Sequence, residues 1–191
     1  MTSAATFAVR KSIALILCMG AAAVICLNIA LILQNRRLKE ELVAPPALVP
    51  KVGTRIDGLR GIALDGSKIQ LPFTGQGKET LLFVFATNCG ICTLNWPTWQ
   101  SIARSIQGKP FQLVYADVMS PMSEHYVEEY HIAGARIFAQ LDPEDEVALN
   151  LRLTPLTILL ANNGEVEKVW VGLLDGQQLS DLKRRLGLAN S

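Results

Sequence analysis

The motif Cys89-Gly90-Ile91-Cys92 stands between an apolar run and a stretch of helical character, and this junction constrains the fold more than any other feature. The apolar run is 80–86, and the helical stretch is 93–107. Two thiols at positions i and i+3 of a helix lie on one face, near enough to form a disulfide with each other. The first thiol would lie at the helix N-terminus, where unpaired N–H groups and the helix dipole stabilise a thiolate. The sequence therefore predicts a strand, a nucleophilic cysteine pair and a helix in succession.

Cys89 and Cys92 are the only cysteines outside the long apolar N-terminal segment, because Cys18 and Cys26 fall within it. A disulfide-stabilised scaffold needs more bridges than one pair can supply. A closed zinc site needs four ligands, and the two histidines of the chain are distant in sequence, so no metal ligand is assigned. The pair indicates a redox dithiol, with Cys89 as the attacking thiolate and Cys92 as the resolving thiol. No cofactor is expected beyond this redox-active disulfide.

Residues 12–33 contain no charged side chain and have the length of a membrane span. At about 1.5 Å per residue, a helix of this length covers the roughly 30 Å of a bilayer core. A cleaved signal peptide is the alternative, although the run is long for one and no A-x-A-like cleavage site follows it. Arg10 and Lys11 precede the run and three basic residues follow it closely, so the flanking charges do not determine the orientation.

The chain divides into four predicted regions: an N-terminal tail over 1–11, a transmembrane signal anchor over 12–33, a linker over 34–50 and a domain over 51–191. The linker carries three prolines, which favour an extended and fairly stiff spacer. The domain holds 13 basic and 15 acidic residues, so its net charge is near −2. Because it shows no basic stripe, we expect no nucleic-acid partner.

Hydrophobic patterning predicts alternating strands and helices through the domain. The expected strands are 61–64, 68–71, 80–86, 111–117, 135–141, 156–161 and 165–171, and the expected helices are 93–107, 123–131, 142–152 and 180–186. Asp65-Gly66 and Asn162-Asn163-Gly164 are typical of hairpin turns. This order implies an α/β fold with a mixed central sheet and helices on both faces.

Three features of the domain together resemble the membrane-anchored thioredoxin-like proteins of the TlpA/ResA family: the run LLFVFATNCGIC, Pro97 in the following helix, and Thr154-Pro155 before LTILLANNGEV. The resemblance covers about residues 51–188, and the N-terminal anchor also fits. It implies a thioredoxin-like fold and a thiol–disulfide oxidoreductase, single-pass in the inner (cytoplasmic) membrane, with its domain in the periplasm or extracytoplasmic space. The implied partners are disulfides or dithiols of exported proteins, for example in cytochrome c maturation, and a membrane electron-donor protein.

The resemblance also assigns residues around the cysteine pair. Pro155 is expected in cis and facing the pair, so that the Thr154 backbone can pair with an extended substrate chain. Without the resemblance, Thr-Pro before a strand is an ordinary trans strand entry. Gly90 and Ile91, between the two thiols, carry no charge and are both expected to contact the substrate, with Ile91 giving an apolar contact.

Three positions depart from the family's pattern. Thr87 stands where an aromatic residue is common, and Asn95 stands where a Glu is common. Phe83 stands where thioredoxin itself has a buried acid. No carboxylate is therefore visible near the pair in the sequence, and the direction of electron flow stays open.

A copper-binding or metal-delivery protein of the same fold is the alternative, because two thiolates can hold Cu(I). Such relatives usually add a histidine ligand near the pair, and only His125 or His131 could serve here. Both histidines flank a Glu-rich helix, and on the residues alone we expect them at its solvated surface.

Overall fold

The computed structural model describes residues 19–20, 24–34, 48–75, 77–119, 121–132 and 136–188. The chain forms two compact units, Met1–Pro46 and Ala47–Ser191. The tail predicted over 1–11, and parts of the predicted anchor and linker, lie outside the described residues. The domain predicted over 51–191 falls within the second unit.

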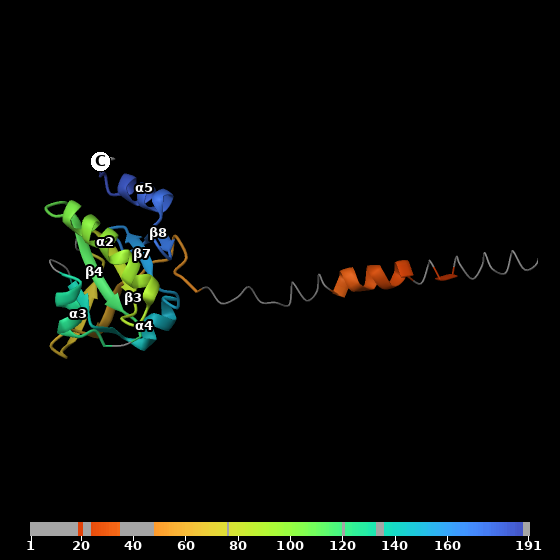
Figure 1. Ribbon diagram of the computed structural model, residues 1–191, viewed down its shortest axis with the longest axis horizontal. Coiled ribbons are helices and arrows are strands. Elements are labelled where there is room, and N and C mark those ends of the chain that lie inside the picture. The colour runs from red at the N-terminus through yellow and green to blue at the C-terminus, as the bar shows by residue number, and fades with distance from the viewer. Residues whose placement is uncertain are drawn as a thin grey trace, which may run out of the picture. The chain divides into compact units, whose positions relative to one another are not determined.

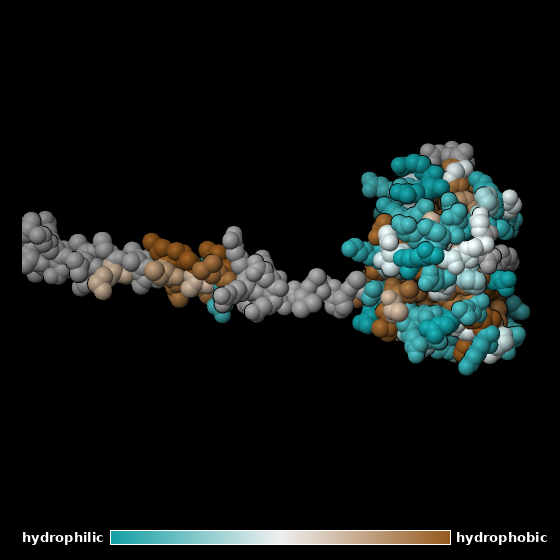
Figure 2. Space-filling model, turned by 180° about the vertical axis from the view of Figure 1, so that it is seen from behind, coloured by the Kyte–Doolittle hydropathy of each residue, from teal (hydrophilic) through white to brown (hydrophobic). Residues whose placement is uncertain are grey.

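Residues 24–34 of the first unit form a helix. Its apolar side chains are exposed, as the brown surface in Figure 2 shows. The amide Nδ2 of Asn28 donates to the Val24 carbonyl oxygen at 2.9 Å, so this polar side chain finds its partner within the helix. Among the described residues, no helix is both long enough and apolar enough to span a bilayer.

A five-stranded mixed sheet forms the centre of the second unit (Figure 1). In sheet order its strands are β5 (Arg136–Phe138), β4 (Phe111–Asp117), β3 (Glu79–Phe85), β7 (Leu156–Leu160) and β8 (Val166–Val171). Strand β3 pairs in parallel with β4 and antiparallel with β7. All of its residues except Glu79 are buried. The prediction of a buried central strand before the cysteine pair is confirmed.

Three helices cover one face of this sheet, namely α2 (Gly90–Ser105), α3 (Glu124–Glu129) and α5 (Gly176–Arg185). Aromatic side chains of β3 pack there against α2 and α5, and the contacting residues are Phe83, Phe85, Trp96, Trp99 and Leu182. The ring centroids of Phe83 and Trp99 are 4.9 Å apart in a stacked arrangement. These aromatic rings fix helix α2 on the central strand.

A second sheet packs on the other face. It is antiparallel, and its order is β2 (Lys68–Pro72), β1 (Gly58–Ile62) and β6 (Gln140–Leu141). Its Leu59 and Leu71 share a buried cluster with Leu82 and Val84 of β3. Helix α4 (Pro143–Ala148) supplies no apolar side chain to either cluster, because it is short and its first turn is acidic. The expectation that helices cover both faces is therefore corrected: on this face the small sheet provides the cover.

Local boundaries also differ from the expectation. Helix α4 stops short of Arg152, and Asn150 adopts a positive φ of 54° just beyond its end. The terminal helix expected to contain residues 180–186 is α5, and the Asp175 carboxylate caps its start by accepting from the Gln178 N–H at 2.9 Å. The strand expected over 135–141 is divided between β5 and β6, which belong to different sheets.

An ion pair joins the small sheet to α4. The Asp145 carboxylate is buried, and it accepts from the Arg60 backbone N–H at 2.7 Å and from the Arg60 Nε–H at 3.1 Å. We expect Asp145→Ala to lower Tm by about 5 °C, because it removes the acceptor of the Arg60 main-chain amide and the closer of two carboxylates from the Arg60 guanidinium. Thermal unfolding followed by circular dichroism measures the change.

Glu144→Ala is the matched control on the same helix. The Glu144 carboxylate also contacts the Arg60 guanidinium, with an Oε2–Nη2 distance of 3.4 Å, but Glu144 is exposed. Surface pairs of this kind contribute little, so we expect a Tm change of about 1 °C or less. An equal fall in Tm in the two variants would contradict the stabilising role assigned to the buried Asp145 carboxylate.

Candidate active site

The cysteine pair lies at the N-terminus of α2, directly after the central strand. Cys89 and Cys92 form a disulfide, with their Cα atoms 5.2 Å apart. Cys89 is the N-cap residue of the helix, and its Sγ accepts from the Cys92 backbone N–H at 3.1 Å. The first turn of α2 carries no acidic residue that would oppose a negative charge on this sulfur. The local geometry therefore suits a thiolate at Cys89.

The two sulfurs differ in their access to solvent. Cys89 is half-buried. Cys92 is fully buried, in the same apolar cluster as Phe85 and Trp96. Between them, Gly90 is exposed and Ile91 is 55% exposed. A substrate that approaches from solvent therefore reaches Cys89 first, and this supports the attacking and resolving roles expected from the sequence.

The turn between β3 and α2 places the pair at the end of the sheet where the central strand β3 finishes. The Cys89 N–H donates to the Ala86 carbonyl oxygen at 3.0 Å, which closes the turn around Thr87. Helix α2 then continues through Pro97 to its end. The pair thus extends from the C-terminal edge of the sheet, where α/β proteins commonly place their binding sites.

Pro155 lies at the same edge of the sheet as the pair. The Thr154–Pro155 peptide bond is cis, as the family resemblance leads one to expect. Because Val84 of β3 pairs with Leu156 of β7, Pro155 directly precedes the paired residues, at the end of β3 that leads to the cysteine pair. Pro155 is buried, and Thr154 is partly exposed beside it. The structure therefore brings the cysteine pair and the Thr-Pro segment to one edge, although their role in substrate binding stays a prediction.

Asn95 is buried one turn beyond Cys92, in a role that sequence reasoning missed. Its Nδ2 donates to the Gly172 carbonyl oxygen at 3.0 Å, and its Oδ1 accepts from the Leu174 N–H at 2.9 Å. These bonds join α2 to the loop between β8 and α5. From the sequence, Asn95 could only be described as standing where the family often has a Glu. Its backbone partners are distant in the chain, and no neighbouring residue identifies them.

A buried carboxylate also lies at this edge of the sheet, although none was visible near the pair in the sequence. Asp117 ends β4, is fully buried, and pairs in register with Phe85 of β3. Its Oδ1 accepts from the Met119 N–H at 3.0 Å. The available signal was its place at the C-terminal end of a strand parallel to β3, because such ends meet at one edge.

The aromatic side chains beneath the pair make its surroundings apolar. Trp96 packs edge-on against Phe85, with ring centroids 5.1 Å apart, and its Nε1–H donates to the Tyr126 hydroxyl at 3.0 Å. Burial raises the pKa of Tyr126, so this phenol is neutral at ordinary pH. Apolar surroundings of this kind exclude water from the buried sulfur of Cys92.

The histidines do not approach the pair in a metal-binding arrangement. His125 and His131 are both exposed, as their sequence context predicts. In the part of the chain that the structure describes, no three His, Cys, Asp or Glu side chains gather to hold a metal ion.

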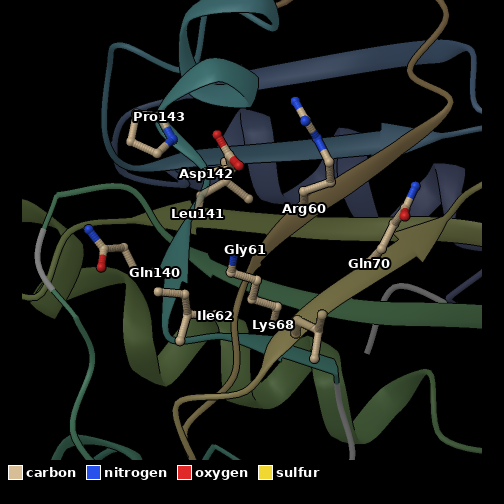
Figure 3. A pocket seen from close by; sticks show the side chains of 10 residues that line it. Arg60, Gly61, Ile62, Lys68, Gln70, Gln140, Leu141, Asp142 and Pro143 are labelled. Atoms are coloured by element: carbon tan, nitrogen blue, oxygen red, sulfur yellow. The ribbon is translucent and has the colours of Figure 1, made fainter.

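A pocket of about 480 Å³ lies elsewhere, over strands β1, β2 and β6 (Figure 3). Arg60, Gln70 and Gln140 are among its lining residues. It includes none of the site residues predicted from the sequence. The cysteine pair therefore lies outside this pocket.

Comparison with known proteins bears on both fold and activity. No protein-family model matches the chain. The chain is similar to the sporulation thiol-disulfide oxidoreductase A of Bacillus subtilis, with 25% identity over 122 residues that cover 62% of this chain and 73% of the relative.

Two solved structures share the fold. One is a Chlorobium tepidum protein provisionally described as thiol:disulfide interchange protein DsbE, with a TM-score of 0.57, 18% identity, and coverage of 72% of this chain and 96% of that chain. The other is the thioredoxin domain of a Bacteroides vulgatus thiol-disulfide oxidoreductase, with a TM-score of 0.55, 19% identity, and coverage of 71% and 96%. The thioredoxin-like α/β fold with a mixed sheet, which the sequence predicted for the domain, is confirmed.

Proposed function

We propose that this chain, a thioredoxin-like thiol–disulfide oxidoreductase, reduces disulfides of exported proteins through the Cys89–Cys92 dithiol. The observation that carries the proposal is the 3.1 Å hydrogen bond from the Cys92 N–H to the Cys89 Sγ. It places a half-exposed sulfur at a helix N-terminus, where a thiolate is stabilised. The similarity to the Bacillus subtilis oxidoreductase supports the same class of reaction.

The reaction starts from the dithiol form. The Cys89 thiolate attacks one sulfur of the substrate disulfide, which breaks, and the other substrate sulfur leaves as a thiolate. Cys92 then loses its proton, and its sulfur attacks Cys89 in the mixed disulfide, which releases the second substrate thiolate. The substrate gains two electrons and takes up two protons, and the protein ends in the disulfide form seen in the structure. A dithiol donor protein in the membrane restores the reduced pair by the reverse exchange.

The substrate chain lies beside the pair in an extended conformation. Thr154, partly exposed next to the cis Pro155, supports this placement, because the backbone beside a strand end can pair with an extended peptide. Ile91, between the two cysteines, contributes an apolar contact to that peptide.

A membrane anchor holds the domain on the periplasmic or extracytoplasmic side of the inner membrane. The charge-free run over 12–33 and the prolines of the linker over 34–50 support this arrangement. The exposed apolar side chains of the helix at 24–34 are consistent with it. A reporter fused after Ser191 tests the topology: an alkaline phosphatase fusion is expected to be active, and activity only of a cytoplasmic reporter would overturn the localisation.

Insulin reduction by the full-length protein in detergent tests the activity. We expect the protein to accelerate the dithiothreitol-driven precipitation of insulin, and its Cys89–Cys92 potential to be measurable against glutathione. The same preparation is titrated with Cu(I). A dithiol that binds Cu(I) tightly and never exchanges with insulin would contradict the proposal in favour of metal delivery.

Cytochrome c maturation is the process in which we place this reduction. A strain that lacks the chain is expected to accumulate less cytochrome c with bound haem, as haem staining of membrane proteins measures. The wild-type chain should restore it and a Cys89→Ser chain should not. Normal cytochrome c in the deletion strain would exclude this process while leaving the activity itself in place.

A further inference from the structure

The loop between β8 and α5 is held in one shape by Asn95. The Asn95 side chain is fully buried, and it bonds the carbonyl oxygen of Gly172 and the N–H of Leu174. Leu173 lies between these two anchored residues and is 44% exposed. Anchoring the backbone on both sides of Leu173 restricts the positions that its side chain can occupy.

The same loop is tied to the Thr-Pro segment. The Gly172 N–H donates to the Pro155 carbonyl oxygen at 2.9 Å, while the Gly172 carbonyl accepts from Asn95. Gly172 therefore connects helix α2 to the residues next to the cis peptide bond. Leu174 belongs to the same buried apolar cluster as Cys92, so the residue that follows Leu173 lies in the core that also holds the Cys92 sulfur.

Exposed apolar side chains occur on all three of these connected segments. They are Ile91 and Leu94 on α2, Leu153 just before Thr154, and Leu173 on the loop. Single exposed leucines are common on protein surfaces. Here, however, the Asn95 side chain and the Gly172 backbone hydrogen-bond α2, whose N-cap is Cys89, to the loop and to the Thr-Pro segment. During exchange, the part of the substrate that contacts this surface is the peptide on either side of its target cysteine.

We infer that Asn95 is a positioning residue that holds Leu173 as an apolar wall of the substrate site, and that the enzyme prefers disulfides with an apolar side chain next to the target cysteine. This inference rests on the proposed oxidoreductase function. An asparagine suits the position because its amide offers one donor and one acceptor, matched to one carbonyl and one N–H. A carboxylate could accept from Leu174 but could not donate to Gly172.

Two synthetic disulfide-cyclised peptides test the preference, one with leucine and one with serine beside the first cysteine. We expect wild-type full-length protein to reduce the leucine peptide with about tenfold higher kcat/KM, mainly through KM. Leu173→Ser and Asn95→Ala should each reduce this preference to about twofold or less. Asn95→Asp, which keeps only the acceptor, should fall between. The rate with glutathione disulfide, which lacks an extended apolar segment, should stay within about twofold in every variant.

The double variant and a surface control make the test specific. Because Asn95 acts through Leu173, adding Asn95→Ala to Leu173→Ser should cause little further loss. Val147→Ser, at an exposed apolar position on α4 outside the three segments, should leave the preference unchanged. Equal rates for the two peptides in the wild type would overturn the inference alone. If Asn95→Ala lowered kcat/KM for glutathione disulfide as much as for the leucine peptide, Asn95 would act on the thiols and not through Leu173. A wild type that reduces none of these disulfides would overturn the proposed function and the inference together.

Discussion

Replacing Cys89 with serine is expected to lower insulin reduction by at least about a thousandfold. The serine hydroxyl is not ionised at neutral pH and forms no mixed disulfide, so the first exchange step is lost. The fold should persist in this variant, because serine is a favoured N-cap residue and its Oγ can accept from the Cys92 N–H as the Cys89 Sγ does. The precipitation of insulin measures the activity, and circular dichroism against the reduced wild type measures the fold.

Cys92→Ser separates the two cysteine roles. This variant keeps the attacking thiol but cannot resolve the mixed disulfide, so it should accumulate a covalent complex with its substrate. The complex should be visible as a band on a non-reducing gel that dithiothreitol removes. If Cys89→Ser formed the trapped complex and Cys92→Ser did not, the assignment from helix position and exposure would be reversed.

Trp99→Ala is expected to lower the free energy of unfolding by about 3–5 kcal/mol. Trp99 has no exposed surface and stacks on Phe83 of the central strand, with ring centroids 4.9 Å apart. Its Nε1–H also donates to the buried Thr157 hydroxyl at 3.0 Å, and that partner would be lost with the ring. Such a loss is a large part of the stability of a domain of this size. Urea unfolding of the reduced and oxidised protein measures it.

Two variants show which part of the tryptophan matters. Trp99→Phe keeps an aromatic ring and removes the donor to Thr157, so we expect a smaller loss of about 1–2 kcal/mol. Leu94→Ala changes a side chain of α2 that is 64% exposed, and its effect should stay within about 0.5 kcal/mol. A loss in Trp99→Ala no larger than in Leu94→Ala would contradict the aromatic cluster as the support of α2.

The elements next to the motif could be predicted because their signals are local. The apolar run before Cys89 matches β3 within one residue at each end, and the run from Phe111 to Asp117 matches β4. The Asp65-Gly66 turn was a reliable hairpin signal, and Gly66 adopts the positive φ of 80° that such turns require. In each case a pattern of neighbouring residues determines the structure without help from distant segments.

The cover of the second face could not be predicted in the same way. Alternating strands and helices suggested helices there, but α4 has too few apolar residues to form a core-facing stripe. The hairpin of β1 and β2 supplies Leu59 and Leu71 instead. Which element occupies a sheet face depends on the competition between all apolar faces in the domain, and no single segment encodes that outcome.

By itself the sequence determined the reactive pair and its place in the fold. The i, i+3 spacing of Cys89 and Cys92 and the junction between strand and helix are local properties, so the helix N-terminus at the first sulfur was predictable. Only the tertiary structure decided what surrounds the pair. Asn95 bonds a carbonyl 77 residues away, and Asp117 reaches the same edge through the parallel pairing of β4 with β3. Such partners depend on how distant segments pack, and residue spacing along the chain does not record it.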